Sequence, residues 1–197
     1  RGNIQNFENK DISLYLGPDF HFVIYPVNQN NEFNFISIIR KELIEDGISN
    51  RNLFNDKTFI NNLINQISSK SDLNLTKIVK EVKCFPIFIS KKIQIPKYKN
   101  IFLTGDAFFS FPPSLAQGAS QSIEAANELF NDFKDNSSNY YKTRVLKTKL
   151  INSRSSINHF AFHLTNSINI FFRNLFLKYL SKNKNFLENY LGKIYKS

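Results

Sequence analysis

The sequence predicts a mixed α/β chain, and three patterns support this fold class. Residues 11–40 alternate between apolar and other side chains, which is typical of strands. Residues 56–69 repeat apolar residues at helical spacing. A short apolar run at 100–104 leads through Gly105-Asp106 into another helical pattern. The chain is 42% hydrophobic and contains 21 Phe, which is enough to build a core and excludes a disordered chain.

The first part of the chain predicts an antiparallel meander. Ile12, Leu14 and Leu16 alternate with other residues, and a Gly-Pro-Asp turn follows at 17–19. A β-rich run covers 20–27, a polar turn covers 28–31, and a third apolar run covers 32–40. Short turns of this kind join neighbouring antiparallel strands.

Helical spacing predicts one helix over 56–69 and a second, short helix over 73–82. The apolar face of the first helix consists of Phe59, Ile60, Leu63, Ile64 and Ile67. Strand character returns over 84–95, where Phe85, Ile87 and Ile89 alternate. Cys84 is expected to be a small buried hydrophobic residue.

Residues 100–104 predict a short buried strand that ends at Gly105-Asp106. A helix follows Gly118, and its inward face is predicted to consist of Ile123, Ala126, Leu129, Phe130 and Phe133. A polar break covers 135–139, and two or more basic helices are expected over 140–195. Residues 160–180 are rich in aromatic side chains, but polar residues interrupt them, so no transmembrane span is predicted.

The net charge of +10 belongs to the last third of the chain. Residues 136–197 contain 11 Lys or Arg and a single acid, Glu188, whereas the preceding residues balance to zero. Three interpretations of this basic segment are open: it steers anionic ligands, it lies against an anionic membrane, or it is a solvated helix face in a protein of Lys-rich composition. A nucleic-acid partner is not predicted, because basic residues interleaved with exposed aromatics and a known binding module are both missing.

Cysteine and methionine counts narrow the class of protein. The single Cys excludes a disulfide framework and a multi-Cys zinc site. His159 and His163 are four residues apart, but no third ligand is suggested, so we expect packing roles and no metal. The chain has no Met and begins with Arg1, which predicts that the native N-terminus lies upstream. Residues 1–10 are polar, so no signal peptide is predicted.

The segment from Gly105 to Ser120 has the features of a ligand site. A Gly at a strand end lets a ligand approach the backbone, and the Asp106 carboxylate is an acceptor for ligand hydroxyls. Pro112 and Pro113 stiffen the loop. Gly118-Ala119-Ser120 places backbone N–H groups at a helix N-terminus, where negative charge is favoured. A polyol joined to a ring that becomes anionic would suit this arrangement.

Residues 103–124 resemble the second FAD motif of the class A flavin-dependent aromatic hydroxylases, which have the para-hydroxybenzoate hydroxylase fold. The family pattern is Gly-Asp-Ala-Ala-His, a Pro seven residues after the Asp, and Gln-Gly four residues further on; Asp106, Pro113 and Gln117-Gly118 match it. The closest resemblance is to the salicylate-hydroxylase group, and it covers the family's C-terminal half only. The family's His is Phe109 here, and its Glu-Asp-Ala is Glu124-Ala-Ala. Both departures leave flavin affinity in question.

The resemblance implies a division into three segments. Residues 1–97 would form the substrate-domain sheet with inserted helices, mostly antiparallel. Residues 98–135 would supply the distal FAD motif, a strand, a loop and a helix. Residues 136–197 would form the basic C-terminal helices. The family's Gly-x-Gly-x-x-Gly nucleotide motif is not in this chain, so the chain alone is expected to bind flavin weakly or not at all.

The resemblance also implies the cofactor contacts. Asp106, which follows Gly105, would bind the ribityl chain, and Pro113 would lie against the flavin ring. The backbone that follows Gln117, through Gly118, Ala119 and Ser120, would face the pyrimidine edge.

The reaction implied is reduction of FAD by NADH or NADPH, addition of O2 to give a flavin C4a-hydroperoxide, and hydroxylation of a small phenolic substrate. His21 and Tyr25 are the candidate catalytic residues, on a strand where His21, Val23 and Tyr25 share one face, and either face of that strand could line the pocket. The expected location is the cytoplasm. The alternatives are a ubiquinone-biosynthesis-type hydroxylase at a membrane, and a non-catalytic remnant that binds a partner or a membrane through the basic tail.

Overall fold

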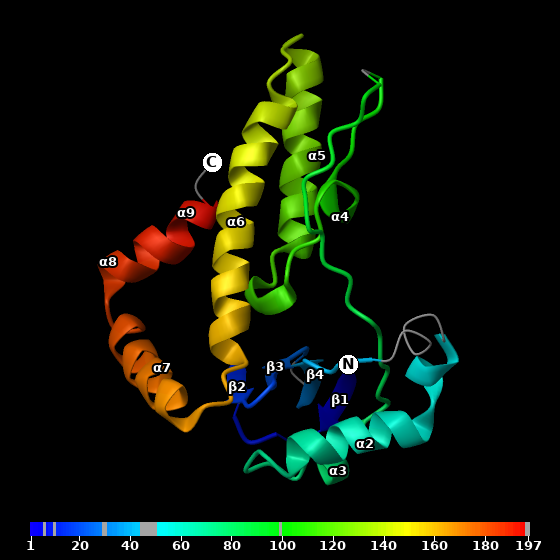
Figure 1. Cartoon of the computed structure of the whole chain (residues 1–197), viewed down its shortest axis with the longest axis vertical. Helices are drawn as coiled ribbons and strands as arrows, with labels where there is room; N and C mark the ends of the chain where they lie inside the picture. The colour runs from blue at the N-terminus through cyan, green and yellow to red at the C-terminus, as the bar shows by residue number, and fades with distance from the viewer. Residues whose placement is uncertain (6, 10, 29–30, 44–50, 99, 196–197) are drawn as a thin grey trace. The chain divides into compact units, whose positions relative to one another are not determined.

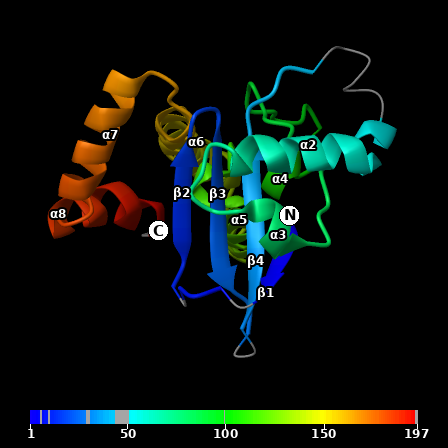
Figure 2. The ribbon, with the colours of Figure 1, turned by 90° about the horizontal axis from the view of Figure 1, so that it is seen from below.

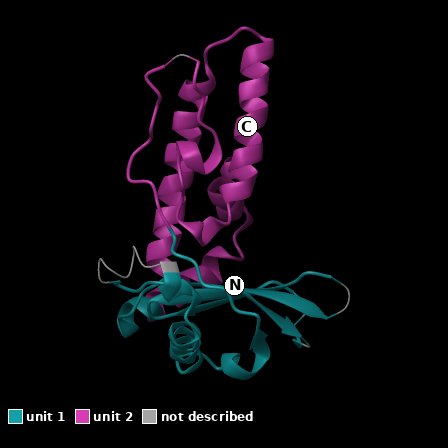
Figure 3. Ribbon diagram, turned by 90° about the vertical axis from the view of Figure 1, so that its right-hand side faces the viewer, with its two compact units in different colours: residues 1–87, 162–170 teal, residues 88–161, 171–197 magenta. Residues whose placement is uncertain are grey.

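The computed structural model describes residues 1–5, 7–9, 11–28, 31–43, 51–98 and 100–195 (Figure 1). The chain divides into two compact units, which Figure 3 colours separately. Unit 1 consists of residues 1–87 and 162–170, and unit 2 consists of residues 88–161 and 171–197. The predicted mixture of strands and helices is confirmed.

Unit 1 is built on one antiparallel sheet with the strand order β2-β3-β4-β1-β5. Its strands are β1 (Gly2–Gln5), β2 (Ser13–Gly17), β3 (Phe20–Pro26), β4 (Glu32–Ile39) and β5 (Val79–Lys80). Both pairings of the predicted meander are present, because β2 pairs with β3 and β3 pairs with β4; the predicted turn at 28–31 lies partly outside the described residues. Gly17 lies opposite Phe20, and a Cβ at position 17 would overlap the Phe20 ring, so this first turn requires glycine.

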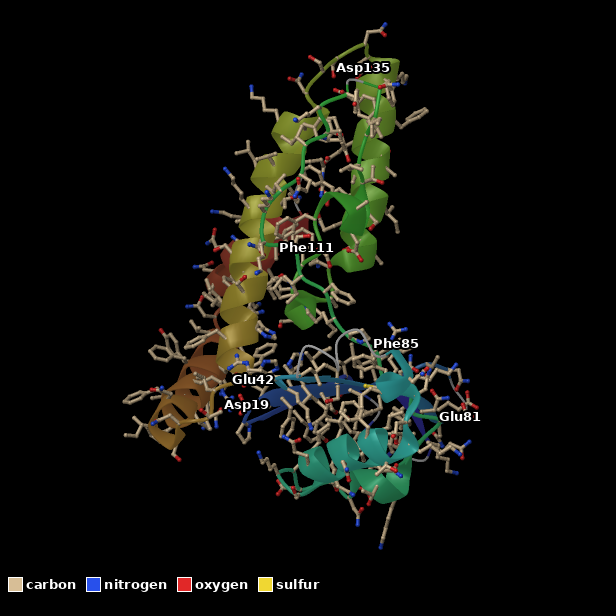
Figure 4. All side chains as sticks on the ribbon, turned by 45° about the vertical axis from the view of Figure 1, so that its right-hand side comes forward. Asp19, Glu42, Glu81, Phe85, Phe111 and Asp135 are labelled. Carbon is tan, nitrogen blue, oxygen red and sulfur yellow. The ribbon has the colours of Figure 1, made fainter. Side chains whose placement is uncertain are left out.

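Helix α2 (Lys57–Ser68) closes the core of unit 1. The Asp56 carboxylate caps the helix by accepting hydrogen bonds from the backbone N–H groups of Thr58 at 2.6 Å and Phe59 at 3.1 Å. Figure 2 shows α2 lying across the strands, and Figure 4 shows side chains filling the space between the sheet and α2. The buried apolar cluster consists of Ile4, Phe20, Phe22, Ile24, Phe33, Phe35, Ile64, Ile67 and Leu75.

The second predicted helix is shorter than the spacing suggested. A 3-10 turn, η1 (Arg51–Asn55), precedes α2, and α3 (Leu75–Ile78) follows it. After Ile78 the chain joins the sheet as β5, where Lys80 pairs with Asn3 of β1. Sheet pairing therefore ends the helix four residues before the predicted boundary at 82.

Unit 2 is mainly helical, as the basic tail predicted. Its helices are α5 (Gly118–Lys134), α6 (Tyr140–Phe162), α7 (Ser167–Leu180, of which residues 171–180 lie in unit 2), α8 (Lys184–Leu187), a π-turn η3 (Glu188–Gly192) and α9 (Lys193–Tyr195). The polar break at 135–139 separates α5 from α6. Within the described ranges, none of the helices has the length and apolarity that crossing a membrane requires.

Two predicted strands, at 84–95 and 100–104, are wrong in the described part of the chain. Neither segment forms a strand there: residues 91–92 form a bend, and a single backbone bond joins the Ser90 N–H to the Ser110 carbonyl at 3.0 Å. Tyrosines take the place of a neighbouring strand: the Leu103 N–H donates to Tyr141 Oη at 3.1 Å, and Tyr140 Oη donates to the Leu103 carbonyl at 2.8 Å. The alternating residues of 84–95 are exposed, and Cys84 is half-buried rather than buried.

The predicted inward face of α5 is also wrong. Ile123, Phe130 and Phe133 are 58–73% exposed, Ala126 is exposed and Leu129 is only half-buried. The buried residues of this helix are Gln121 and Ala125, which lie on the opposite side at 3.6 residues per turn. Polar contacts with α6 decide the orientation of α5, and its apolar residues, Ile123, Phe130 and Phe133, form an exposed surface, named here the α5 stripe.

Candidate functional site

The candidate site begins at α4 (Gly105–Phe108), a single helical turn in unit 2. Gly105 has φ +55°, the left-handed region that glycine adopts without strain. A Cβ there would also meet the hydroxyl of Ser122 on α5. Glycine at this position therefore lets the chain pass close to α5. Asp106 follows in the first turn and is exposed to solvent.

The loop after α4 returns the chain to the start of α5. Pro113 begins a 3-10 turn, η2 (Pro113–Leu115), and Pro112 before it is buried. Ala116 adopts φ 52°, which redirects the backbone into Gln117. The two prolines thus fix the path between the exposed Asp106 and the helix, as the sequence predicted.

The N-terminus of α5 presents backbone donors to solvent. Gln117 precedes the helix without a side-chain cap, and Gly118, Ala119 and Ser120 are all exposed. The N–H groups of a first helical turn have no partner within the helix, and they carry the positive end of its dipole. A Cβ added to Gly118 would meet no atom within 4 Å, so space is open beside this residue.

A polar network beneath this turn fixes α5 against α6. Arg144 on α6 is only 2% exposed, and it donates to Gln121 Oε1 at 2.7 Å and to Glu128 Oε2 at 3.1 Å. Its guanidinium also lies 3.9 Å from Glu124, which pairs with Lys147 at 2.9 Å. Gln121 donates in turn to Gln117 Oε1 at 3.3 Å, so the network reaches the residue that precedes Gly118. Arg144 therefore holds the turn that offers the free donors.

A small crevice joins the parts of this site. Its lining includes Gly105, Asp106, Gly118, Gln121 and Arg144, and it has room for about one water molecule. Among the described residues no group accepts a hydrogen bond from Nε of Arg144, which is buried. An ordered water in the crevice would satisfy this atom. A ligand of any size must lie on the open surface beside Asp106 and Gly118 rather than inside the crevice.

Tyr140 stabilises the other side of the loop. Burial raises the pKa of its phenol to about 12, so at neutral pH it is a neutral hydrogen-bond donor to the Leu103 carbonyl. Tyr141 packs against Phe102 with ring centroids 6.0 Å apart and donates to the Ile101 carbonyl at 3.2 Å. These contacts hold the extended segment that leads into Gly105.

The two candidate catalytic residues belong to unit 1. Phe22 and Ile24 point into the core of unit 1, so that face of β3 cannot line a pocket. The face that carries His21 and Tyr25 is the remaining candidate. On that face Tyr25 Oη accepts a hydrogen bond from Asn34 at 3.1 Å. His21 is 4% exposed, and its Nδ1 lies 2.8 Å from Nε2 of His163, which is 1% exposed. One proton joins these two nitrogens.

The two histidines of the C-terminal helices have separate roles. His163 pairs with His21 in unit 1, and His159 Nδ1 lies 3.3 Å from the Ser114 hydroxyl in unit 2. No group of three or more His, Cys, Asp or Glu side chains able to hold a metal gathers in the part of the chain that the structure describes. Burial raises the pKa of the Cys84 thiol.

The structure gathers most of the predicted cofactor residues around one turn. Gly105, Asp106 and Gly118 line the same crevice, and Gln117, Ala119 and Ser120 adjoin it. Pro113 lies in the connecting loop. Gln121 and Arg144 were not predicted as site residues. Glutamates at i and i+4 on one helix, with an Arg on the next, are the signal that could have identified this network.

Comparison with known proteins gives no family assignment. No family model matches this chain, and no curated protein matches it significantly.

Proposed function

We propose that this chain forms part of an FAD-dependent monooxygenase that hydroxylates a small phenolic substrate with NADH or NADPH and O2. The observation that carries the proposal is the turn that combines the exposed Asp106 carboxylate with the open N-terminus of α5 at Gly118. The spacing of Gly105, Asp106, Pro113 and Gln117-Gly118, which resembles the distal FAD motif of the aromatic hydroxylases, supports the same assignment.

The residues of this turn fit the part of FAD that carries the ring. Asp106 would accept hydrogen bonds from hydroxyls of the ribityl chain. The N–H groups of Gly118, Ala119 and Ser120 would donate to the carbonyl edge of the ring and favour negative charge there. Open space beside Gly118 gives the ring access to these donors, and the Arg144 network keeps them in place. When bound, FAD would supply the hydride acceptor and the site of O2 activation.

The departures from the family pattern have a partial structural account. Glu124 is retained, and the carboxylate missing at Ala125 has a functional neighbour in Glu128, which lies one turn on and pairs with Arg144 at 3.1 Å. Phe109, in place of the family's His, is buried. The loop is therefore braced through Arg144 rather than through the usual carboxylate.

For the substrate, the face of β3 that carries His21, Val23 and Tyr25 is the proposed wall. His21 Nδ1 lies 2.8 Å from His163 Nε2, so His163 would orient the His21 ring, which would serve as the base for the phenol. Tyr25 on the same face has its hydroxyl engaged by Asn34, which suits a pocket wall better than a proton carrier.

Flavin content and turnover of the native protein test the proposal. The protein purified from its source, with whatever chain adjoins these residues, should release FAD on denaturation. It should oxidise NADH or NADPH faster when salicylate or para-hydroxybenzoate is added. His21→Gln should lower the turnover of the phenol without releasing the flavin. A native protein without flavin, and with no phenol-stimulated NAD(P)H oxidation, would contradict the assignment.

A further inference from the structure

Helix α7 carries an exposed apolar surface made almost entirely of aromatic residues. Within unit 2 it consists of Phe171, Phe172, Leu175, Phe176 and Tyr179, named here the α7 stripe. At 3.6 residues per turn these five side chains fall on one side of the helix. All five are 50–68% exposed. A stripe of this spacing usually faces a protein core, so its exposure requires an explanation.

The other side of α7 binds the protein. Arg173 is buried, and its guanidinium donates to the Ala161 carbonyl at 3.3 Å and to Asn174 at 2.9 Å. Asn174 is the next residue of α7, so the bond to the Ala161 carbonyl, at the end of α6, is the one that orients this side of the helix. The α7 stripe therefore points away from the protein because the polar side is anchored.

Charge distinguishes the α7 stripe from the α5 stripe. Helix α5 contains three acids, Glu124, Glu128 and Asp132, with Lys134 as its only base. Helix α7 contains no acid, and Lys178 lies beside its stripe; Lys182 and Lys184 follow directly and are exposed. Across residues 136–197 the count is 11 bases against one acid. An anionic lipid surface complements α7, whereas α5 offers it a single lysine and the exposed end of the helix near Asp132, with Glu124 and Glu128 paired to Arg144 and Lys147.

We propose that the α7 stripe lies in the interface of an anionic membrane, with its aromatic rings among the acyl chains and its lysines at the headgroups. Aromatic and Leu side chains on one face with Lys at the boundary are typical of helices that bind membranes parallel to the surface. Lysine stems can extend towards the headgroups while their alkyl parts stay apolar. The proposal does not depend on the flavin, because no residue of the α7 stripe belongs to the candidate site.

Vesicle flotation tests the proposal with the whole 197-residue chain. The chain should float with vesicles of phosphatidylglycerol and phosphatidylcholine, and it should remain in solution with phosphatidylcholine alone. The double substitution Phe171→Ser/Phe176→Ser should lower the partition coefficient by about ten-fold or more, since burial of each Phe contributes to membrane affinity. Lys178→Glu/Lys182→Glu should also lower it, and added salt should weaken binding of the unchanged chain.

The matched control is the α5 stripe. Ile123→Ser/Phe130→Ser removes apolar residues of equal or greater exposure from a helix of the same unit, and it should leave the partition coefficient within about two-fold. Far-UV circular dichroism and thermal melting establish that each variant is folded. Equal losses in the α5 and α7 variants would overturn the proposal, because they would indicate non-specific adhesion.

A spectroscopic measurement gives a second, independent readout. The chain contains no Trp, so Phe172→Trp places a single indole reporter in the α7 stripe and Phe130→Trp places one in the α5 stripe. On addition of anionic vesicles the emission of the Phe172→Trp variant should shift to the blue, and that of the Phe130→Trp variant should stay unchanged. The proposal fails if the chain does not bind anionic vesicles. It also fails if sedimentation shows a dimer that Phe171→Ser/Phe176→Ser converts to a monomer, because the α7 stripe would then lie between two copies of the chain.

Discussion

The two units differ in how polar their buried residues are. Unit 1 surrounds a core of Phe, Ile and Leu that the sheet and α2 close between them. Unit 2 buries polar residues, among them Gln121, Arg144 and Thr148, beside apolar ones such as Phe108 and Ile151, and the large apolar residues of its α5 and α7 stripes face outward. A unit with a closed apolar core is stable by its own burial, since burial is the main favourable term in folding.

The largest expected effect is on stability, when a buried Phe of unit 1 is compared with an exposed Phe of unit 2. Phe22→Ala empties a fully buried site in the core of unit 1 and should lower the free energy of unfolding by about 3–5 kcal/mol. Phe130→Ala on the α5 stripe should change it by less than about 0.5 kcal/mol, because no buried contact is lost. Urea denaturation followed by circular dichroism measures both. Comparable losses would mean that the α5 stripe is buried in solution.

Arg144 should be the most sensitive polar residue of unit 2. Arg144→Ala removes the partner of Gln121 and Glu128, and should cost about 2 kcal/mol through lost charge-assisted hydrogen bonds. Lys142→Ala on the same helix is exposed and is the matched control, with an expected change below about 0.5 kcal/mol. If denaturant titrations give the two variants equal stability, Arg144 does not hold α5 in place.

The two glycines of the candidate site should respond differently to alanine. Gly105→Ala forces a Cβ into the left-handed region and against Ser122, and should cost about 1–2 kcal/mol. Gly118→Ala adds a methyl to open space and should not lower the free energy of unfolding by more than about 0.5 kcal/mol. Thermal melting of the two variants distinguishes a strained turn from an open one. A neutral Gly105→Ala would show that the turn accommodates a side chain.

The smallest effect is expected at alkaline pH. The pKa of Tyr140 is raised from 10.0 to about 12 by burial, so the folded state holds this proton more tightly than the unfolded chain. The contribution of the protonated phenol to the free energy of unfolding is complete below pH 10.0 and is lost as the pH rises towards about 12. Tyr140→Phe should be less stable at neutral pH and should show a flatter decline over this range. An unchanged slope in melting temperature against pH would exclude Tyr140 as the source.

Local patterns predicted most of unit 1. Alternation and turn residues indicated the meander, and helical spacing indicated α2, because these features depend on neighbours in sequence. The same patterns failed at 84–104 and on α5. A strand needs a partner, and the hydroxyls of Tyr140 and Tyr141 supply the bonds instead. The orientation of α5 depends on Arg144, which lies 23 residues from its partner Gln121 in sequence.

The candidate site also has one part that the sequence predicted and one part that it did not. The turn from Gly105 to Ser120 could be predicted because its chemistry lies within one short segment. The pairing of His21 with His163 could not, since it joins residues 142 apart in sequence. The sequence suggested only a packing role for His163 and left the partner of His21 open.

Flavin retention by the native protein is the most direct test of the central claim, that Asp106 and the N-terminus of α5 hold the cofactor. The comparison is between Asp106→Ala and Asp135→Ala, which removes an exposed acid at the far end of α5 (Figure 4). After equal dialysis, Asp106→Ala should lose most of its FAD absorbance and its NAD(P)H oxidation. Asp135→Ala should keep both. Full retention of flavin and turnover in Asp106→Ala would contradict the account.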